Sequence, residues 1–190
     1  MYFNVTIITV SKKQFILETV ESVLSSIIVL MVIYVSVALP EMVWGSSMEP
    51  NFYTKERILV ERVTKNLSDG FERGEVVVLK PEGTSHHMIK RIVGIPGDIF
   101  KIYDCEVYIS RDGSRFKLEE PYLDAEICTS GRTAIKEGRS LKLEENQYVL
   151  LGDNRDVSMD SRVLGVIKKD DIIGRVVFRF WPLSRTGFIK

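Results

Sequence analysis

An uncharged, apolar segment close to the N-terminus limits the possible folds of this chain more than any other feature. Ser22–Leu39 contains no charged residue. As a helix, its roughly 18 residues would rise about 27 Å, which is close to the thickness of about 30 Å of a bilayer's hydrocarbon core. We therefore predict a transmembrane anchor over residues 19–40.

Two other interpretations of this segment stay open. A cleaved signal peptide is one, because the run Ser36-Val37-Ala38 has small residues at a suitable spacing. Signal h-regions, however, run to about 7–15 residues, and no basic cluster opens the chain at Met1. A buried core helix is the other, although long helices of globular domains usually carry a polar face. A retained anchor fits the pattern better than either.

The basic residues beside the anchor predict its orientation. Lys12 and Lys13 precede it, and after it neither Lys nor Arg occurs until Lys55. By the positive-inside rule, residues 1–18 lie in the cytoplasm and residues 41–190 lie outside. The chain is then expected to be a single-pass protein of the plasma membrane, in contact with the lipid bilayer.

Charge and cysteine content narrow the possible partners. Lys plus Arg and Asp plus Glu number 26 each, so no net charge attracts nucleic acid. Two histidines and two cysteines are too few to assign a His/Cys zinc site.

The two cysteines can form a disulfide. Outside the membrane, a bond between Cys105 and Cys128 is permitted; it would close a loop of about 24 residues and stabilise the fold by about 3 kcal/mol. Two separate buried cysteines are an equal alternative.

Beyond the anchor the pattern is mostly β. Short apolar or β-branched runs end at Pro, Gly or Asp, which stop strands or form turns. The polar, turn-rich stretch Glu119–Glu145 suggests that residues of about 100–145 form a smaller inserted lobe. We predict a mainly β fold, with coiled antiparallel sheets and a smaller β lobe. The expected strands are Arg57–Val63, Glu75–Lys80, Met88–Val93, Ile99–Ile102, Glu106–Ile109, Gln147–Leu151 and Arg175–Trp181, with one helical turn at Lys168–Ile172.

A serine beside the membrane raises the question of a hydrolase. Ser47 lies a few residues after the anchor, and amide hydrolysis needs a nucleophile, a base and an oxyanion site. The two histidines, His86 and His87, are adjacent in a polar run, which is typical of a solvated loop. Lys90 lies in an apolar strand, but it can act as a base only if its pKa falls from about 10.4 to about 7–8, as burial allows. A lysine that protects an edge strand against aggregation is the competing interpretation.

A third polar segment, residues 152–162, directly follows an expected strand. Asp160 and Arg162 can form a charge pair that stiffens the loop, and Ser158 can orient a lysine amine. Read alone, the segment is equally compatible with an ordinary polar turn.

Taken together, these segments resemble type I signal peptidases, the membrane-anchored Ser/Lys proteases that remove signal peptides. The resemblance runs from the anchor to the C-terminus and rests on four motifs in the family's order. It implies that Ser47 is the nucleophile, Lys90 the general base, Ser158 the residue that orients the lysine, and Asp160 and Arg162 a supporting ion pair. The motifs are Ser47-Met48-Glu49-Pro50, Arg73-Gly74-Glu75-Val76-Val77-Val78, Lys90–Asp98 and Gly152–Gly165.

The resemblance also implies a substrate and a setting. Preprotein signal peptides would be cleaved after small residues at −1 and −3 through an acyl-enzyme, close to the secretion translocon and without a metal or nucleotide. Shallow pockets for the −1 and −3 side chains would be lined by Val43, Met48, Met88 and Ile89.

The chain departs from the family pattern at two positions. Asn51 stands where many members have threonine, and Gly45 stands where some members have a serine that donates to the oxyanion. Loss of one such donor costs about 10²–10³ in rate elsewhere, so rate rather than reaction type is affected. Two competing functions are a self-cleaving Ser/Lys repressor, which would need a DNA-binding helix pair in place of the anchor, and an anchored peptide-binding domain without activity.

Overall fold

The computed structural model describes residues 11–67, 70–124 and 126–189, and the chain divides into two compact units, Met1–Val37 and Ala38–Lys190. The first contains helix α1, Lys12–Val37, in which Lys12–Val32 is long and apolar enough to cross a membrane. Two of its hydroxyls donate to the carbonyl one turn earlier, Thr19 to Phe15 and Ser26 to Ser22, both at 2.8 Å. These bonds satisfy polar groups that hydrocarbon could not solvate.

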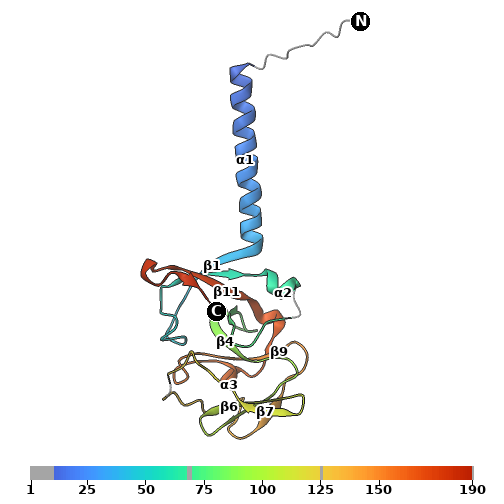
Figure 1. The fold of residues 1–190 in the computed structure, drawn as a ribbon, viewed down its shortest axis with the longest axis vertical. Coiled ribbons are helices and arrows are strands. Elements are labelled where there is room, and N and C mark those ends of the chain that lie inside the picture. Colours follow the sequence, from blue (N-terminus) through green and yellow to red (C-terminus); the bar gives the residue numbers. More distant parts are fainter. Residues whose placement is uncertain (1–10, 68–69, 125, 190) are drawn as a thin grey trace. The chain divides into compact units, whose positions relative to one another are not determined.

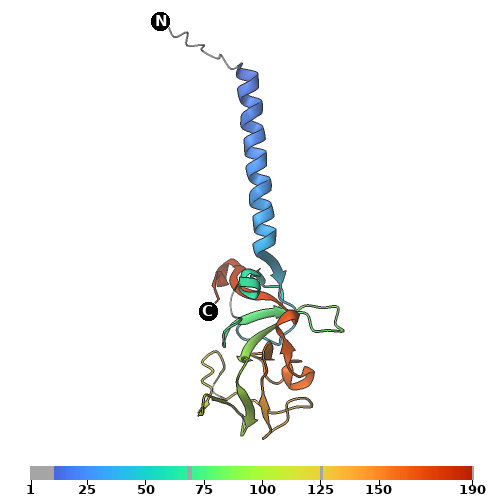
Figure 2. The same ribbon diagram turned by 90° about the vertical axis from the view of Figure 1, so that its right-hand side faces the viewer.

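The second unit is built on two antiparallel sheets (Figures 1 and 2). Among the described residues, the larger has eight strands in the order β1-β2-β11-β3-β4-β9-β10, with β12 paired to β11. The late strand β11 therefore lies between two early strands, β2 and β3. The bounds are β1 Ala38–Met42, β2 Arg57–Glu61, β3 Val76–Leu79, β4 Met88–Gly94, β9 Gln147–Leu151, β10 Ile167–Lys168, β11 Ile172–Trp181 and β12 Gly187–Phe188.

The smaller sheet falls in the stretch for which a smaller lobe is predicted. Its order is β7-β6-β5-β8, and its strands are β5 Ile99–Tyr103, β6 Glu106–Arg111, β7 Ser114–Lys117 and β8 Ser140–Lys142. Alternate residues of the β5–β6 hairpin, Phe100, Ile102, Val107 and Ile109, point into one apolar cluster. Strand alternation thus packs this sheet against β4 and β9 of the larger sheet, which contribute Val93, Val149 and Leu151 to the same cluster.

A disulfide joins Cys105 and Cys128, which are 23 positions apart in the sequence. Cys105 occupies the turn of the β5–β6 hairpin, where Asp104 and Cys105 have φ of 52° and 66°. Positive φ at both central residues is the type I′ geometry that suits the twist of a hairpin. Thr129 N–H also donates to the Cys105 carbonyl at 2.9 Å. The open question of the two thiols is therefore answered in favour of a pair.

The predicted fold class is confirmed: curled antiparallel sheet, a smaller second sheet and one N-terminal apolar helix. The strand expected at Arg57–Val63 ends earlier, at Glu61, and the short helix α2, Val63–Leu67, follows it. The Glu61 carboxylate explains the change, because it accepts from the backbone N–H groups of Val63 and Thr64 at 2.8 and 3.1 Å. A carboxylate in this position caps the first turn of a helix.

The structure contains further elements that the sequence did not suggest. Strand β1 includes Ala38 and Leu39, which the apolar pattern had assigned to the anchor. It pairs along its length with β2, from Ala38 opposite Glu61 to Met42 opposite Arg57. The helical turn expected at Lys168–Ile172 is present as the 3-10 turn η1, Lys169–Asp171. The other additions are β7, β8, β10, β12, the helix α3 at Ser161–Leu164, and the 3-10 turn η2 at Leu183–Arg185.

Candidate active site

Ser47 lies in a tight turn between β1 and β2. Met48 and Phe52, both buried, hold this loop against an apolar cluster, and the Phe52 N–H donates to the Met48 carbonyl at 2.8 Å. Ser46 is exposed, whereas Ser47 is partly exposed and its carbonyl accepts from Asn154 N–H at 3.0 Å. These contacts hold the Ser47 backbone in place, and the Ser47 side chain stays accessible to a ligand.

Lys90, in β4, contacts the Ser47 hydroxyl. Its Nζ lies 2.7 Å from Ser47 Oγ and 2.8 Å from the Ile89 carbonyl oxygen, and the residue is 4% exposed. Burial lowers the pKa of Lys90 to about 8, although the carboxylates of Asp160 and Asp153 act in the opposite direction. A lysine with this pKa has a substantial neutral fraction near physiological pH. Its amine lone pair can then accept the serine proton.

The alternation predicted for β4 is visible in its packing. Ile89 belongs to the apolar cluster that contains Val43 and Met48, whereas Ile92 belongs to a second cluster on the other face. Met88 packs against this second cluster as well. Lys90 shares the parity of Met88 and Ile92, so apolar neighbours surround its stem.

Asp160 and Arg162 form a buried ion pair in the loop after β9. Both oxygens of the carboxylate are used: Oδ1 accepts from Arg162 Nε and Oδ2 from Nη2, each at 2.9 Å. Oδ2 also accepts from Gly152 N–H at 3.0 Å. Burial alone would raise the pKa of Asp160, but the hydrogen bonds and charge of Arg162 and the Gly152 N–H keep it below its ordinary value. The carboxylate is therefore ionised next to the lysine.

Ser158 is fully buried in the same loop. Among the described residues its Oγ makes no hydrogen bond of standard geometry, although it lies close enough to the Asp160 carboxylate to help lower the pKa of Asp160. The expected contact of Ser158 with the Lys90 amine stays a prediction. Gly152 explains the close packing here, because a Cβ at that position would lie 2.2 Å from Ser158 Oγ and 2.4 Å from the Ser47 carbonyl oxygen. The loop can approach the serine this closely only because residue 152 has no side chain.

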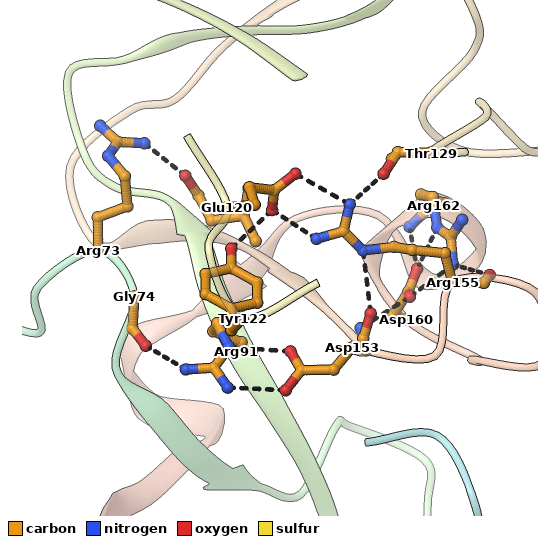
Figure 3. A network of polar contacts seen from close by, with 12 residues as sticks. Arg73, Gly74, Arg91, Glu120, Tyr122, Thr129, Asp153, Arg155, Asp160 and Arg162 are labelled. Atoms are coloured by element: carbon orange, nitrogen blue, oxygen red, sulfur yellow. Dashed lines mark hydrogen bonds and ion pairs between the residues drawn. The ribbon is translucent and has the colours of Figure 1, made fainter. Parts of the chain in front are cut away.

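Arg91 extends the site on the opposite face of β4 (Figure 3). Its guanidinium binds Asp153 through two parallel hydrogen bonds of 2.9 and 2.7 Å and donates to the Gly74 carbonyl at 2.8 Å. Asp153 also accepts from Asn51 Nδ2 at 2.9 Å. The pair thus joins β4, the loop after β9 and the loop that carries the serine.

Residues from the polar stretch before residue 130 complete this network (Figure 3). The Tyr122 ring stacks on the Arg91 guanidinium, with 4.0 Å between the ring centroid and Cζ, and its hydroxyl donates to Glu120 at 2.6 Å. Glu120 forms an ion pair with the buried Arg155, which also donates to Thr129. The contacts of Arg155 with Glu120 and Thr129 could not be predicted, because these partners lie 35 and 26 positions away along the chain.

We expect Asp153→Asn to lower the free energy of unfolding by about 3–5 kcal/mol, because it leaves the buried Arg91 guanidinium without its counter-charge. Urea denaturation followed by circular dichroism measures the change. Asp156→Asn is the matched control, since Asp156 is exposed in the same loop. Equal stability of the two variants would contradict the role given to the Arg91–Asp153 pair.

The four residues predicted to line substrate pockets are only partly brought together. Val43 and Ile89 line a small cavity of about 20 Å³ between β1 and β4. Met48 lies in the apolar cluster beside it, and Met88 packs against the other cluster. A larger cavity of about 1010 Å³ lies behind the serine loop, beside Asn51 and Tyr122, and neither Ser47 nor Lys90 lines it.

Gly45 has φ of +83°, a conformation that favours glycine, and its carbonyl accepts from the Thr54 hydroxyl at 3.0 Å. It offers no side-chain donor at the position where a serine would do so. An oxyanion formed at Ser47 would therefore depend on backbone N–H groups of this turn.

Comparison with known proteins gives consistent results. The family model described as signal peptidase, peptidase S26, matches residues 16–181. Signal peptidase I of Bacillus amyloliquefaciens is 35% identical over 178 residues, which cover 92% of each chain. Signal peptidase I S of Bacillus subtilis is 34% identical, over 92% of this chain and 94% of its own. Signal peptidase IB of Staphylococcus aureus strain COL is 32% identical, over 90% and 93%.

Solved structures are similar as well. The crystal structure of a signal peptidase I from Enterococcus faecalis V583 matches with a TM-score of 0.45 and 24% identity, over 55% of this chain and 95% of that chain.

Proposed function

Because the chain belongs to the signal peptidase family, peptidase S26, we propose that it is a membrane-bound serine endopeptidase that removes N-terminal signal peptides from exported preproteins. Cleavage follows small residues at −1 and −3. The observation that carries the proposal is the contact of 2.7 Å between Ser47 Oγ and the Nζ of Lys90, a buried lysine with a pKa of about 8. A nucleophile within hydrogen-bond reach of a base that is partly neutral is the arrangement that acyl transfer requires.

The reaction has two stages. Neutral Lys90 takes the Ser47 proton as Oγ attacks the carbonyl carbon of the −1 residue. The tetrahedral intermediate collapses, the C–N bond breaks, and the lysine ammonium protonates the leaving amine of the mature protein. Lys90 then removes a proton from water, which attacks the ester carbonyl, and the signal peptide leaves with a new carboxylate while Ser47 regains its proton.

Open strand edges beside the dyad support substrate binding as an added strand. Among the described residues, β1 pairs only with β2, so its other edge is free. Strand β9 pairs with β4 from Arg91 onward, which leaves Met88–Lys90 without a β9 partner. An extended signal-peptide segment can hydrogen-bond to such edges, as in other cases of β-augmentation.

Ser158, Asp160 and Arg162 support the dyad in this proposal. The Arg162 ion pair keeps Asp160 ionised, and Asp160 in turn holds the Gly152 N–H, so the loop keeps its place against Ser47. Ser158 would donate to or accept from the Lys90 amine once a substrate adjusts the site. These residues orient the lysine and do not react.

The anchor gives the reaction its location. Helix α1 fits a single span, with residues 1–18 in the cytoplasm and residues 41–190 outside, on the evidence of Lys12 and Lys13. The lipid bilayer then holds both the peptidase and the apolar part of the signal peptide, near the secretion translocon. Holding two reactants in one plane raises their effective concentration.

The purified full-length protein in detergent, mixed with a preprotein that carries an Ala-x-Ala site, tests the function. We expect one cut after the second alanine, identified by mass spectrometry of both products. Binding of the preprotein without any cleavage would instead indicate an inactive peptide-binding domain and would overturn the proposal.

A further inference from the structure

His87 contacts Glu41 across the opening between β1 and β4. His87 Nδ1 lies 2.9 Å from Glu41 Oε1, although the residues are 46 positions apart. In the larger sheet, β2, β11 and β3 separate the two strands. A contact between side chains from β1 and the start of β4 is possible only because the sheet curls strongly. The sequence pattern indicates a solvated loop for both histidines, and both are exposed; the contact with Glu41 is an addition to that prediction.

The pair forms one end of the small cavity beside the dyad. Glu41 and His87 line it together with Val43 and Ile89, which precede Ser47 and Lys90 in the chain. Its volume of about 20 Å³ is little more than one water molecule requires. A side chain larger than a few carbon atoms cannot enter while both Glu41 and His87 keep their positions.

The position of the cavity fits one residue of an extended substrate. With the −1 carbonyl at Ser47, the −3 side chain lies on the same face of the strand and about 7 Å farther upstream. The strands β1 and β4 run in the same direction, because an odd number of strands in antiparallel pairs separates them. A substrate strand parallel to both would place its −3 residue at the cavity, since Glu41 precedes Ser47 and His87 precedes Lys90. Building on the proposed function, we propose that the Glu41–His87 pair sets the size of the side chain accepted at −3.

The pair acts as a size limit and contributes little to folding. The His87 side chain is 41% exposed and that of Glu41 is 24% exposed, and ion pairs with this much solvent add little stability. Truncation of either side chain therefore enlarges the cavity without disturbing the apolar cluster below it. Glu41→Gln, by contrast, keeps the volume and an acceptor for His87.

Three precursors that differ only at −3, with Ala, Val or Leu, test the proposal in full-length wild type and variants. We expect Glu41→Ala and His87→Ala to raise the ratio of kcat/KM for Leu over Ala about tenfold, the usual effect of a few methylene groups in a pocket. His86→Ala is the matched control, because His86 is exposed and does not line the cavity. His86→Ala and Glu41→Gln should keep the wild-type ratio.

The outcomes separate this inference from the function on which it rests. If wild type cleaves the Ala precursor but the ratio is unchanged in both alanine variants, or all precursors slow equally, the size limit is wrong. A Glu41→Gln ratio as high as that of Glu41→Ala would show that charge sets the preference and would also overturn it. A wild type that cleaves none of the precursors would overturn the proposed function itself.

Discussion

Ser47→Ala is expected to lower kcat for preprotein cleavage by about 10⁴–10⁶-fold, the loss seen when a serine protease loses its nucleophile. Lys90 Nζ, which lies 2.7 Å from Ser47 Oγ, would then have no hydroxyl to deprotonate, and no acyl-enzyme could form. Single-turnover assays with excess enzyme measure the loss directly. Intact mass spectrometry of the wild type at early times should also detect the acyl-enzyme, which the variant cannot form.

Ser46→Ala is the control within the same turn. Ser46 is exposed, and the structure uses its backbone carbonyl, which accepts from Glu49 N–H at 3.2 Å. This substitution should change kcat less than about threefold, because no side-chain contact is lost. If Ser46→Ala were inactive and Ser47→Ala active, the two serines would have to exchange roles.

Lys90→Met is expected to have a similarly large effect, with kcat reduced by about 10⁴-fold or more. Methionine has a comparable length and no charge, so it should fill the buried site of the lysine stem with little strain. Lys80→Met is the control, because Lys80 is exposed at the end of β3. Thermal unfolding of both variants shows whether a loss of activity reflects chemistry or stability.

The pH dependence of the wild type tests Lys90 further. Only the neutral amine is a base, and burial lowers the pKa of Lys90 to about 8. The rate should therefore rise with pH and level off above about pH 8. About a tenth of the lysine is neutral at pH 7 and about a hundredth at pH 6, so kcat/KM should fall nearly tenfold per pH unit there. A flat profile between pH 6 and 8 would exclude lysine as the base.

Much of the fold could be predicted because most of its longer strands follow from short sequence patterns. Met88–Val93 is a short, largely apolar run that ends at a Gly/Pro turn, and the structure forms β4 there. The Asp160–Arg162 pair could be predicted because only one residue separates its members. Strand β1 could not, because Ala38 and Leu39 continue an apolar run and become a strand only through pairing with β2.

The polar part of the site could not be predicted for a related reason. Asn51 binds Asp153, and Arg155 binds Glu120, over separations of 102 and 35 residues. Charged residues in turn-rich stretches are normally solvated, so their partners become visible only when the strands between them are folded. The disulfide of Cys105 and Cys128 stayed undecided for the same reason, since spacing alone does not bring two thiols together.

The position of β11 in the sheet determines when Ser47 and Lys90 can come together during synthesis. Ser47 follows β1 and precedes β2, whereas Lys90 belongs to β4, and β11 is the strand that joins β2 to β3 in the sheet. A chain emerging from its N-terminus carries both reactive groups long before Ile172–Trp181 is available. Until β11 is inserted, no backbone hydrogen bonds join β1 and β2 to β3, β4 and the strands beyond. Nascent chains therefore carry the serine and the lysine in separate pieces, and the proposed catalytic pair is assembled only after Ile172–Trp181 has been synthesised.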